Sequence, residues 1–211
     1  MPRRSARSKR NVEDKAESEE PPKKKTKTMI KQQNGPEQSN ESIKVESGEW
    51  QNANSIYEFK AKDIHGETVS LNKYKGHVCI IVNVASKCGH TNLNYEQFVE
   101  LYEKYAEEKG LRILAFPCNQ FANQEPFDSQ KILEFVNKKN VKFDVFDKIN
   151  VNGKKAHPLW KYMTNKIAGP KGNNIDWNFT KFIINKEGEV VERHKPGEKP
   201  FQLVEYLEKY W

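Results

Sequence analysis

Apolar and polar residues follow a regular order only from about residue 50 onward, and that order predicts strands first. Residues 55–76 are predicted to form a β-hairpin that turns at Asp63 to Gly66. Short apolar runs, several of them rich in β-branched residues, predict further strands, the first of them covered on both faces. These strands are expected at residues 77–84, 111–116, 143–146, 179–184 and 190–193.

Helices are expected between and after these strands, because apolar residues recur there at intervals of three and four. Thr91 and Asp128 are the expected caps of two of them, and Pro158 and Pro200 are the expected first residues of the others, the last helix running to Trp211. Strands that alternate with helices, followed by a hairpin and a helix, predict an α/β fold with a central sheet flanked by helices. A thioredoxin-like arrangement fits this order better than a Rossmann fold, because no Gly-x-Gly-x-x-Gly motif follows the first buried strand.

Residues 1–49 differ from the rest in composition. They contain none of the 23 aromatic residues, none of the three cysteines and only eight apolar residues. So few apolar side chains cannot bury enough surface to offset the chain entropy lost on folding. We therefore expect a disordered basic tail at residues 1–49 and a single folded domain at residues 50–211.

The tail contributes +3 of the formal net charge of +7. Its sequence PPKKKTK at residues 21–27 resembles a nuclear-localisation signal, which predicts binding to a nuclear import receptor and a location in nucleus and cytoplasm. The lysines concerned are Lys23, Lys24, Lys25 and Lys27. A solubilising tail is the alternative; no specific nucleic-acid binding is expected, because the folded part has no basic stripe interleaved with aromatic residues.

The three cysteines have no paired spacing and no apolar signal segment precedes them, which favours a reducing compartment and free thiols. No histidine or cysteine pair has the spacing of a zinc site. Cys79 lies within a predicted buried strand and is expected to serve packing. Cys118 follows the end of the second buried strand, where a structural role is also favoured.

Cys88 stands in the polar turn between the first buried strand and the helix expected at Thr91. The positive end of that helix dipole and the adjacent Lys87 are expected to favour the thiolate and lower the pKa of Cys88. Thr91 occupies the place of thioredoxin's second cysteine, so a local disulfide is excluded. A peroxide, which would oxidise Cys88 to a sulfenic acid, is the expected target.

Three motifs in the same order closely resemble the glutathione peroxidase family, and most of all its phospholipid-hydroperoxide type. They are NVASKCGHT at residues 83–91, LAFPCNQF at 114–121 with QEP at 124–126, and WNFTKF at 177–182. The resemblance spans essentially all of residues 50–211 and implies a thioredoxin-like fold. It implies Cys88, Gln124, Trp177 and Asn178 as catalytic residues, with the last three as neutral hydrogen-bond donors around the sulfur.

The resemblance further implies reduction of hydrogen peroxide and organic or phospholipid hydroperoxides, with glutathione as co-substrate and no cofactor. Many cysteine-containing members resemble thioredoxin-dependent peroxidases and carry a resolving cysteine in the helix after the QEP motif. Asn137 stands near that place here, which favours glutathione, although Cys118 keeps thioredoxin open. A peroxide sensor that passes oxidation to partner proteins is the other alternative. The short connection at residues 167–176 implies a monomer.

Overall fold

The computed structural model describes residues 50–211, and the predicted tail and nuclear-localisation signal lie outside the described residues. Five strands form one mixed sheet in the order β5-β4-β3-β6-β7. The central strand β3 pairs in parallel with β4 and antiparallel with β6. The bounds are β3 Cys79–Val84, β4 Arg112–Pro117, β5 Asp144–Val145, β6 Lys181–Ile184 and β7 Val190–His194.

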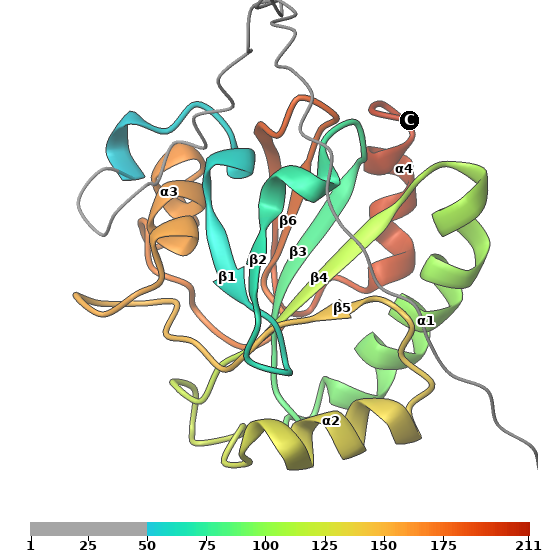
Figure 1. The fold of residues 1–211 in the computed structure, drawn as a ribbon, viewed down its shortest axis with the longest axis vertical. Coiled ribbons are helices and arrows are strands. Elements are labelled where there is room, and N and C mark those ends of the chain that lie inside the picture. The colour runs from blue at the N-terminus through green and yellow to red at the C-terminus, as the bar shows by residue number, and fades with distance from the viewer. Residues whose placement is uncertain (1–49) are drawn as a thin grey trace, which may run out of the picture. The chain divides into compact units, whose positions relative to one another are not determined.

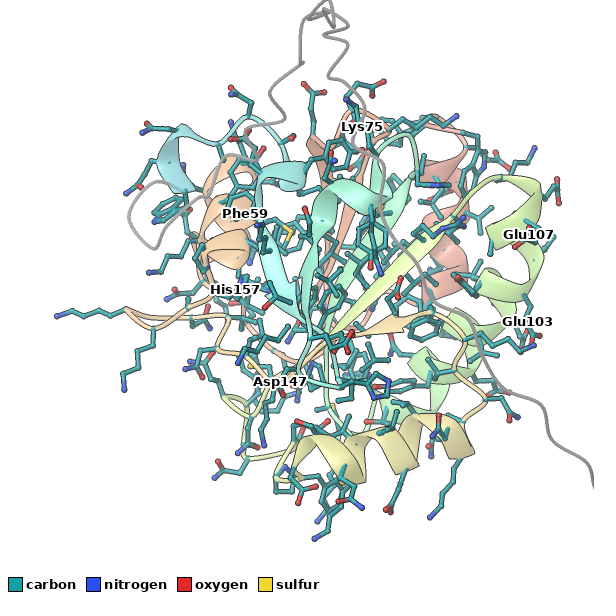
Figure 2. All side chains as sticks on the ribbon, viewed as in Figure 1. Phe59, Lys75, Glu103, Glu107, Asp147 and His157 are labelled. Atoms are coloured by element: carbon teal, nitrogen blue, oxygen red, sulfur yellow. The ribbon has the colours of Figure 1, made fainter. Side chains whose placement is uncertain are left out.

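The predicted hairpin is confirmed as the separate strand pair β1 (Lys60–Lys62) and β2 (Thr68–Ser70). Its turn closes where the backbone N–H of Gly66 donates to Asp63 O at 3.0 Å. The hairpin and α3 (Pro158–Lys166) lie on the same side of the sheet (Figure 1). Figure 2 shows the buried Phe59 ring on this side, and its centroid lies 5.2 Å from that of Tyr162 in α3.

The other side of the sheet is covered by α1 (Thr91–Glu108), α4 (Val204–Leu207) and part of α2 (Ser129–Lys138) (Figure 1). In α1 the apolar residues face the sheet, while Glu103 and Glu107 project outward (Figure 2). The helix ends just before Gly110, whose φ of +72° is one that glycine adopts without strain.

The alternation of side chains along β3 and β4 divides the core into two clusters, one on each face of the sheet. On β3, Ile81 packs on the side of α3 while Ile80 and Val82 pack on the side of α1. Every residue of β3 is buried, which confirms the prediction of a strand covered on both faces.

Two predicted helix features are wrong. Thr91 does not cap α1: His90 holds the cap position without a side-chain bond, and Thr91 is the first helical residue. The last predicted helix is a 3-10 turn at Pro200–Leu203 followed by α4, which ends at Leu207 rather than at Trp211. Asp128 caps α2 as predicted, accepting a hydrogen bond from the Lys131 backbone N–H at 2.9 Å. Among residues 50–211, no helix is long and apolar enough to cross a bilayer.

Candidate active site

The sheet topology gathers three polar loops at one edge. The parallel strands β3 and β4 end there side by side, with Val84 opposite Pro117. The antiparallel strand β6 begins at the same edge, with Lys181 opposite Val82. The loops that follow β3 and β4 and the segment that precedes β6 therefore meet at this edge, as is usual for sites in open α/β sheets.

Cys88 lies in the first of these loops, at the start of α1, and is 8% exposed. Its backbone N–H donates to Thr91 Oγ1 at 3.1 Å, and that hydroxyl in turn donates to Ala85 O at 2.6 Å. The Thr91 backbone N–H donates to Cys88 O at 3.0 Å. Thr91 thus closes the turn around the cysteine instead of capping the helix, and holds the thiol near the helix N-terminus.

Gln124 lies in the loop after β4 and is half-buried. Its backbone carbonyl accepts a hydrogen bond of 3.0 Å from the N–H of Lys87, the residue before the cysteine. Its side-chain Oε1 accepts a hydrogen bond of 2.9 Å from Asn178 Nδ2. Gln124 therefore joins the cysteine loop to the segment before β6.

Trp177 and Asn178 lie in that segment, but their environments differ. Asn178 is fully buried, whereas Trp177 is 36% exposed, and its ring centroid lies 5.8 Å from that of Phe121. Trp177 is therefore not a buried core residue. Part of its side chain is open to solvent at this edge.

Asn83 holds this segment in place, a role that the sequence did not reveal. It is fully buried in β3; its Nδ2 donates to Trp177 O at 3.1 Å and its Oδ1 accepts from the Thr180 N–H at 3.0 Å. Its carbonyl accepts from the N–H of Phe179, which has a φ of +65°. An amide side chain within an apolar run was the available signal, because a buried amide needs hydrogen-bond partners.

The other two cysteines pack away from Cys88. Cys79 and Cys118 are fully buried in the core cluster on the α3 side, whereas Cys88 belongs to the cluster on the α1 side. Burial raises the pKa of Cys79 to about 12 and also raises the pKa of Cys118. All three thiols are free. Within residues 50–211, no group of three or more histidine, cysteine or acidic side chains could hold a metal ion.

This arrangement has counterparts among known proteins. The family model for glutathione peroxidases matches residues 56–164. The chain belongs to the glutathione peroxidase family. The phospholipid hydroperoxide glutathione peroxidase of Callithrix jacchus is 57% identical to it over 159 residues, which are 74% of this chain and 80% of that protein. The sequence-based identification of a peroxidase is thereby confirmed.

Solved structures confirm the predicted fold. In the crystal structure of T. cruzi GPX1 the chain is 40% identical in sequence to this one. The match covers 74% of this chain and 95% of that chain, with a TM-score of 0.62. A thiol:disulfide interchange protein of the thioredoxin family from Chlorobium tepidum TLS is only 15% identical, with a TM-score of 0.55 over 72% of this chain and 92% of its own. At that identity the likeness concerns the fold alone, and it shows that this glutathione peroxidase has the thioredoxin-like architecture.

Proposed function

We propose that this glutathione peroxidase reduces hydrogen peroxide and organic or phospholipid hydroperoxides through Cys88. The observation that carries the proposal is the hydrogen-bonded link between the loop of Cys88, Gln124 and Asn178 at one edge of the sheet. Three segments far apart in sequence are brought together there, as a site assembled from several loops requires.

In the oxidation step the Cys88 thiolate attacks one oxygen of the hydroperoxide. An S–O bond forms while the O–O bond breaks, and the leaving oxygen departs with the bonding electron pair and takes up one proton. The products are the sulfenic acid of Cys88 and an alcohol, or water when the substrate is hydrogen peroxide. Neutral donors near the leaving oxygen would stabilise its developing negative charge.

Gln124 and Trp177 are the proposed donors, and Asn178 is proposed to orient Gln124. Asn178 uses its amide group to donate to Gln124 Oε1, which turns the Gln124 amide so that its Nε2 remains available. The indole N–H of the partly exposed Trp177 is a second donor without charge. Neutral donors support a thiolate without forming an ion pair that would weaken its attack.

Glutathione is the proposed reductant, and no cofactor is required. A first glutathione thiol condenses with the sulfenic acid, forming a mixed disulfide and releasing water. A second glutathione attacks that disulfide and releases oxidised glutathione and the Cys88 thiol. In support, Cys118 packs on the opposite face of the sheet from Cys88, and α2 contains no cysteine that could act in its place.

Phospholipid hydroperoxides are proposed among the substrates because curated relatives at 54–57% identity carry the name phospholipid hydroperoxide glutathione peroxidase. The half-exposed Trp177 and the short connection at residues 167–176 are compatible with an open site in a monomer. Sedimentation of the purified protein tests the monomer directly, and a stable oligomer would contradict it.

The deciding experiment is steady-state peroxide reduction with glutathione and with thioredoxin, each with hydrogen peroxide and with a phosphatidylcholine hydroperoxide. We expect sustained turnover with glutathione, its loss in Cys88→Ser, and retention in the matched control Cys79→Ser. Faster turnover with thioredoxin would make the protein a thioredoxin-dependent peroxidase. Consumption of one equivalent of peroxide followed by a stall would make it a sensor.

We also propose that the protein resides in nucleus and cytoplasm and that its tail binds an import receptor. The support is the basic motif that contains Lys23, Lys24, Lys25 and Lys27. Alanine at these four positions should reduce nuclear accumulation of a fluorescent fusion without changing peroxide turnover. Unchanged nuclear accumulation would contradict the proposal.

A further inference from the structure

Glu125, the residue after Gln124, is a glutamate with no exposed surface beside the cysteine loop. Its Oε2 accepts a hydrogen bond of 2.9 Å from the Ser86 hydroxyl, two residues before Cys88. Its own backbone N–H donates to Asn119 Oδ1 at 2.9 Å. The carboxyl group thus connects the loop after β3 with the loop after β4, and Asn119 holds the Glu125 backbone in place.

The second carboxyl oxygen, Oε1, is buried and has no hydrogen-bond partner. The buried hydroxyl of Tyr95 also has no partner; burial and, to a smaller extent, the charge of Glu125 raise the pKa of Tyr95. An ionised carboxylate in such a place would bury a charge with one oxygen unsatisfied, which is costly. A protonated carboxyl avoids burying the charge, while its carbonyl oxygen accepts the hydrogen bond from Ser86.

The surroundings of Glu125 favour the neutral form. Burial is the largest influence and raises its pKa, while the bonds from Ser86 and the charges of Lys148 and Lys87 lower it less. Neither lysine forms an ion pair with this carboxyl group: Lys148 donates instead to the backbone carbonyls of Glu125 and Phe127. The titratable or charged groups around Glu125 are Lys87, Tyr95, Cys118 and Lys148, with Cys88 in the adjoining loop.

We propose that Glu125 is a positioning residue that carries a proton while Cys88 reacts, so that a neutral carboxyl braces the cysteine loop against the Gln124 loop. The proposal rests on the proposed function, in which Cys88 is the residue that attacks peroxide. A neutral brace keeps the loop in place without setting a second negative charge beside the thiolate. Ionisation of Glu125 would bury a charge with the oxygen Oε1 unsatisfied, which favours displacement of the carboxylate toward water and so disrupts the brace.

A pH dependence follows from this arrangement. The rate of Cys88 oxidation rises with pH as the thiol ionises and falls again as Glu125 loses its proton. Glutamine is the matched replacement, because its carbonyl accepts from Ser86, its amide group is close in size and shape to a carboxyl group, and it never ionises. Glu125→Gln therefore keeps the rising limb and lacks the falling one. At the alkaline end it exceeds wild type by roughly tenfold, a change of about 1.4 kcal/mol in the barrier, because only the wild-type brace is disrupted there.

The experiment is a single-turnover measurement of Cys88 oxidation by hydrogen peroxide, without any reductant, from pH 4.5 to 9. It compares four proteins: wild type, Glu125→Gln, Ser86→Ala and the exposed control Glu96→Gln. The Ser86 bonds lower the pKa of Glu125, so Ser86→Ala should move the falling limb to higher pH, whereas Glu96→Gln should match wild type. If Glu125 only maintained the fold, its replacement would lower the oxidation rate at every pH and would leave the falling limb of the pH profile in place.

Two results would overturn the proposal: a falling limb that persists in Glu125→Gln, or a variant that folds but reacts slowly at every pH because the carboxylate itself is needed. If Glu125→Gln does not fold, the absence of an upward shift of the limb in Ser86→Ala overturns it instead. Consumption of peroxide by Cys88→Ser at the wild-type rate would refute the proposed function. Failure of that function and failure of the role of Glu125 are therefore distinguishable.

Discussion

Replacing Asn83 with alanine removes the side chain that joins β3 to the segment containing Trp177 and Asn178. The variant loses the bond from Asn83 Nδ2 to Trp177 O and the bond from the Thr180 N–H to Asn83 Oδ1. Trp177 O keeps a second donor, because the Thr180 hydroxyl lies 3.2 Å away. The Thr180 N–H, in contrast, is left buried and unpaired.

Two hydrogen bonds of about 1 kcal/mol each, with one buried donor left unsatisfied, give an expected destabilisation of about 2–3 kcal/mol. For a domain of this size, such a loss lowers the melting temperature by roughly 4–12 °C. Phe179 adds to the effect, since its φ of +65° is strained for a bulky side chain and persists only while its neighbours hold it. The segment should relax once Asn83 is removed.

We expect Asn83→Ala to slow Cys88 oxidation by roughly tenfold or more, because misplaced donors lose transition-state stabilisation. Thermal unfolding and stopped-flow oxidation by hydrogen peroxide measure the two effects separately. The control is Asn165→Ala at an exposed position near the end of α3, where stability should change by less than about 0.5 kcal/mol. A destabilised Asn83→Ala protein that reacts at the wild-type rate would refute the argument that this segment supports the chemistry.

Three further predictions concern single side chains. Cys118→Ser should turn over with glutathione at the wild-type rate, because Cys118 packs on the other face of the sheet; a stalled sulfenic acid in steady-state assays would argue against this. Trp177→Phe should slow Cys88 oxidation about tenfold in stopped-flow assays while the melting temperature changes little, since only the indole donor is lost. Burial lowers the pKa of His157 to about 4. The unfolded chain therefore takes up that proton first, and stability should fall by up to about 3 kcal/mol as pH drops from 6.5 to 4. Denaturant titrations should show a shallower fall in His157→Asn, whose amide can still cap α3.

The elements of the fold were largely predictable because their signals are local. Apolar runs identified β3 and β4, and Asp128 and Pro158 marked the starts of α2 and α3. The last helix was predicted too long because helical spacing alone does not show where packing ends. Thr91 was misassigned because a threonine at a helix start bonds equally well to a preceding turn.

For the site, local signals indicated Cys88 alone, since a cysteine between a buried strand and a helix is unusual by itself. Gln124, Trp177 and Asn178 were found through family resemblance, because each has an ordinary alternative role when considered singly. Asn83 and Glu125 were not assigned roles at all. Their importance depends on hydrogen bonds to residues far along the chain, at Thr180 and Ser86.

The order of apolar and polar residues thus determined which segments form strands and helices, since burial and backbone propensity act over a few neighbouring residues. The tertiary structure decided which loops meet at the edge of the sheet, which cysteines lie on opposite faces, and which buried polar groups share partners. Those outcomes arise from strand order and register, and these depend on packing between distant segments that no local pattern records.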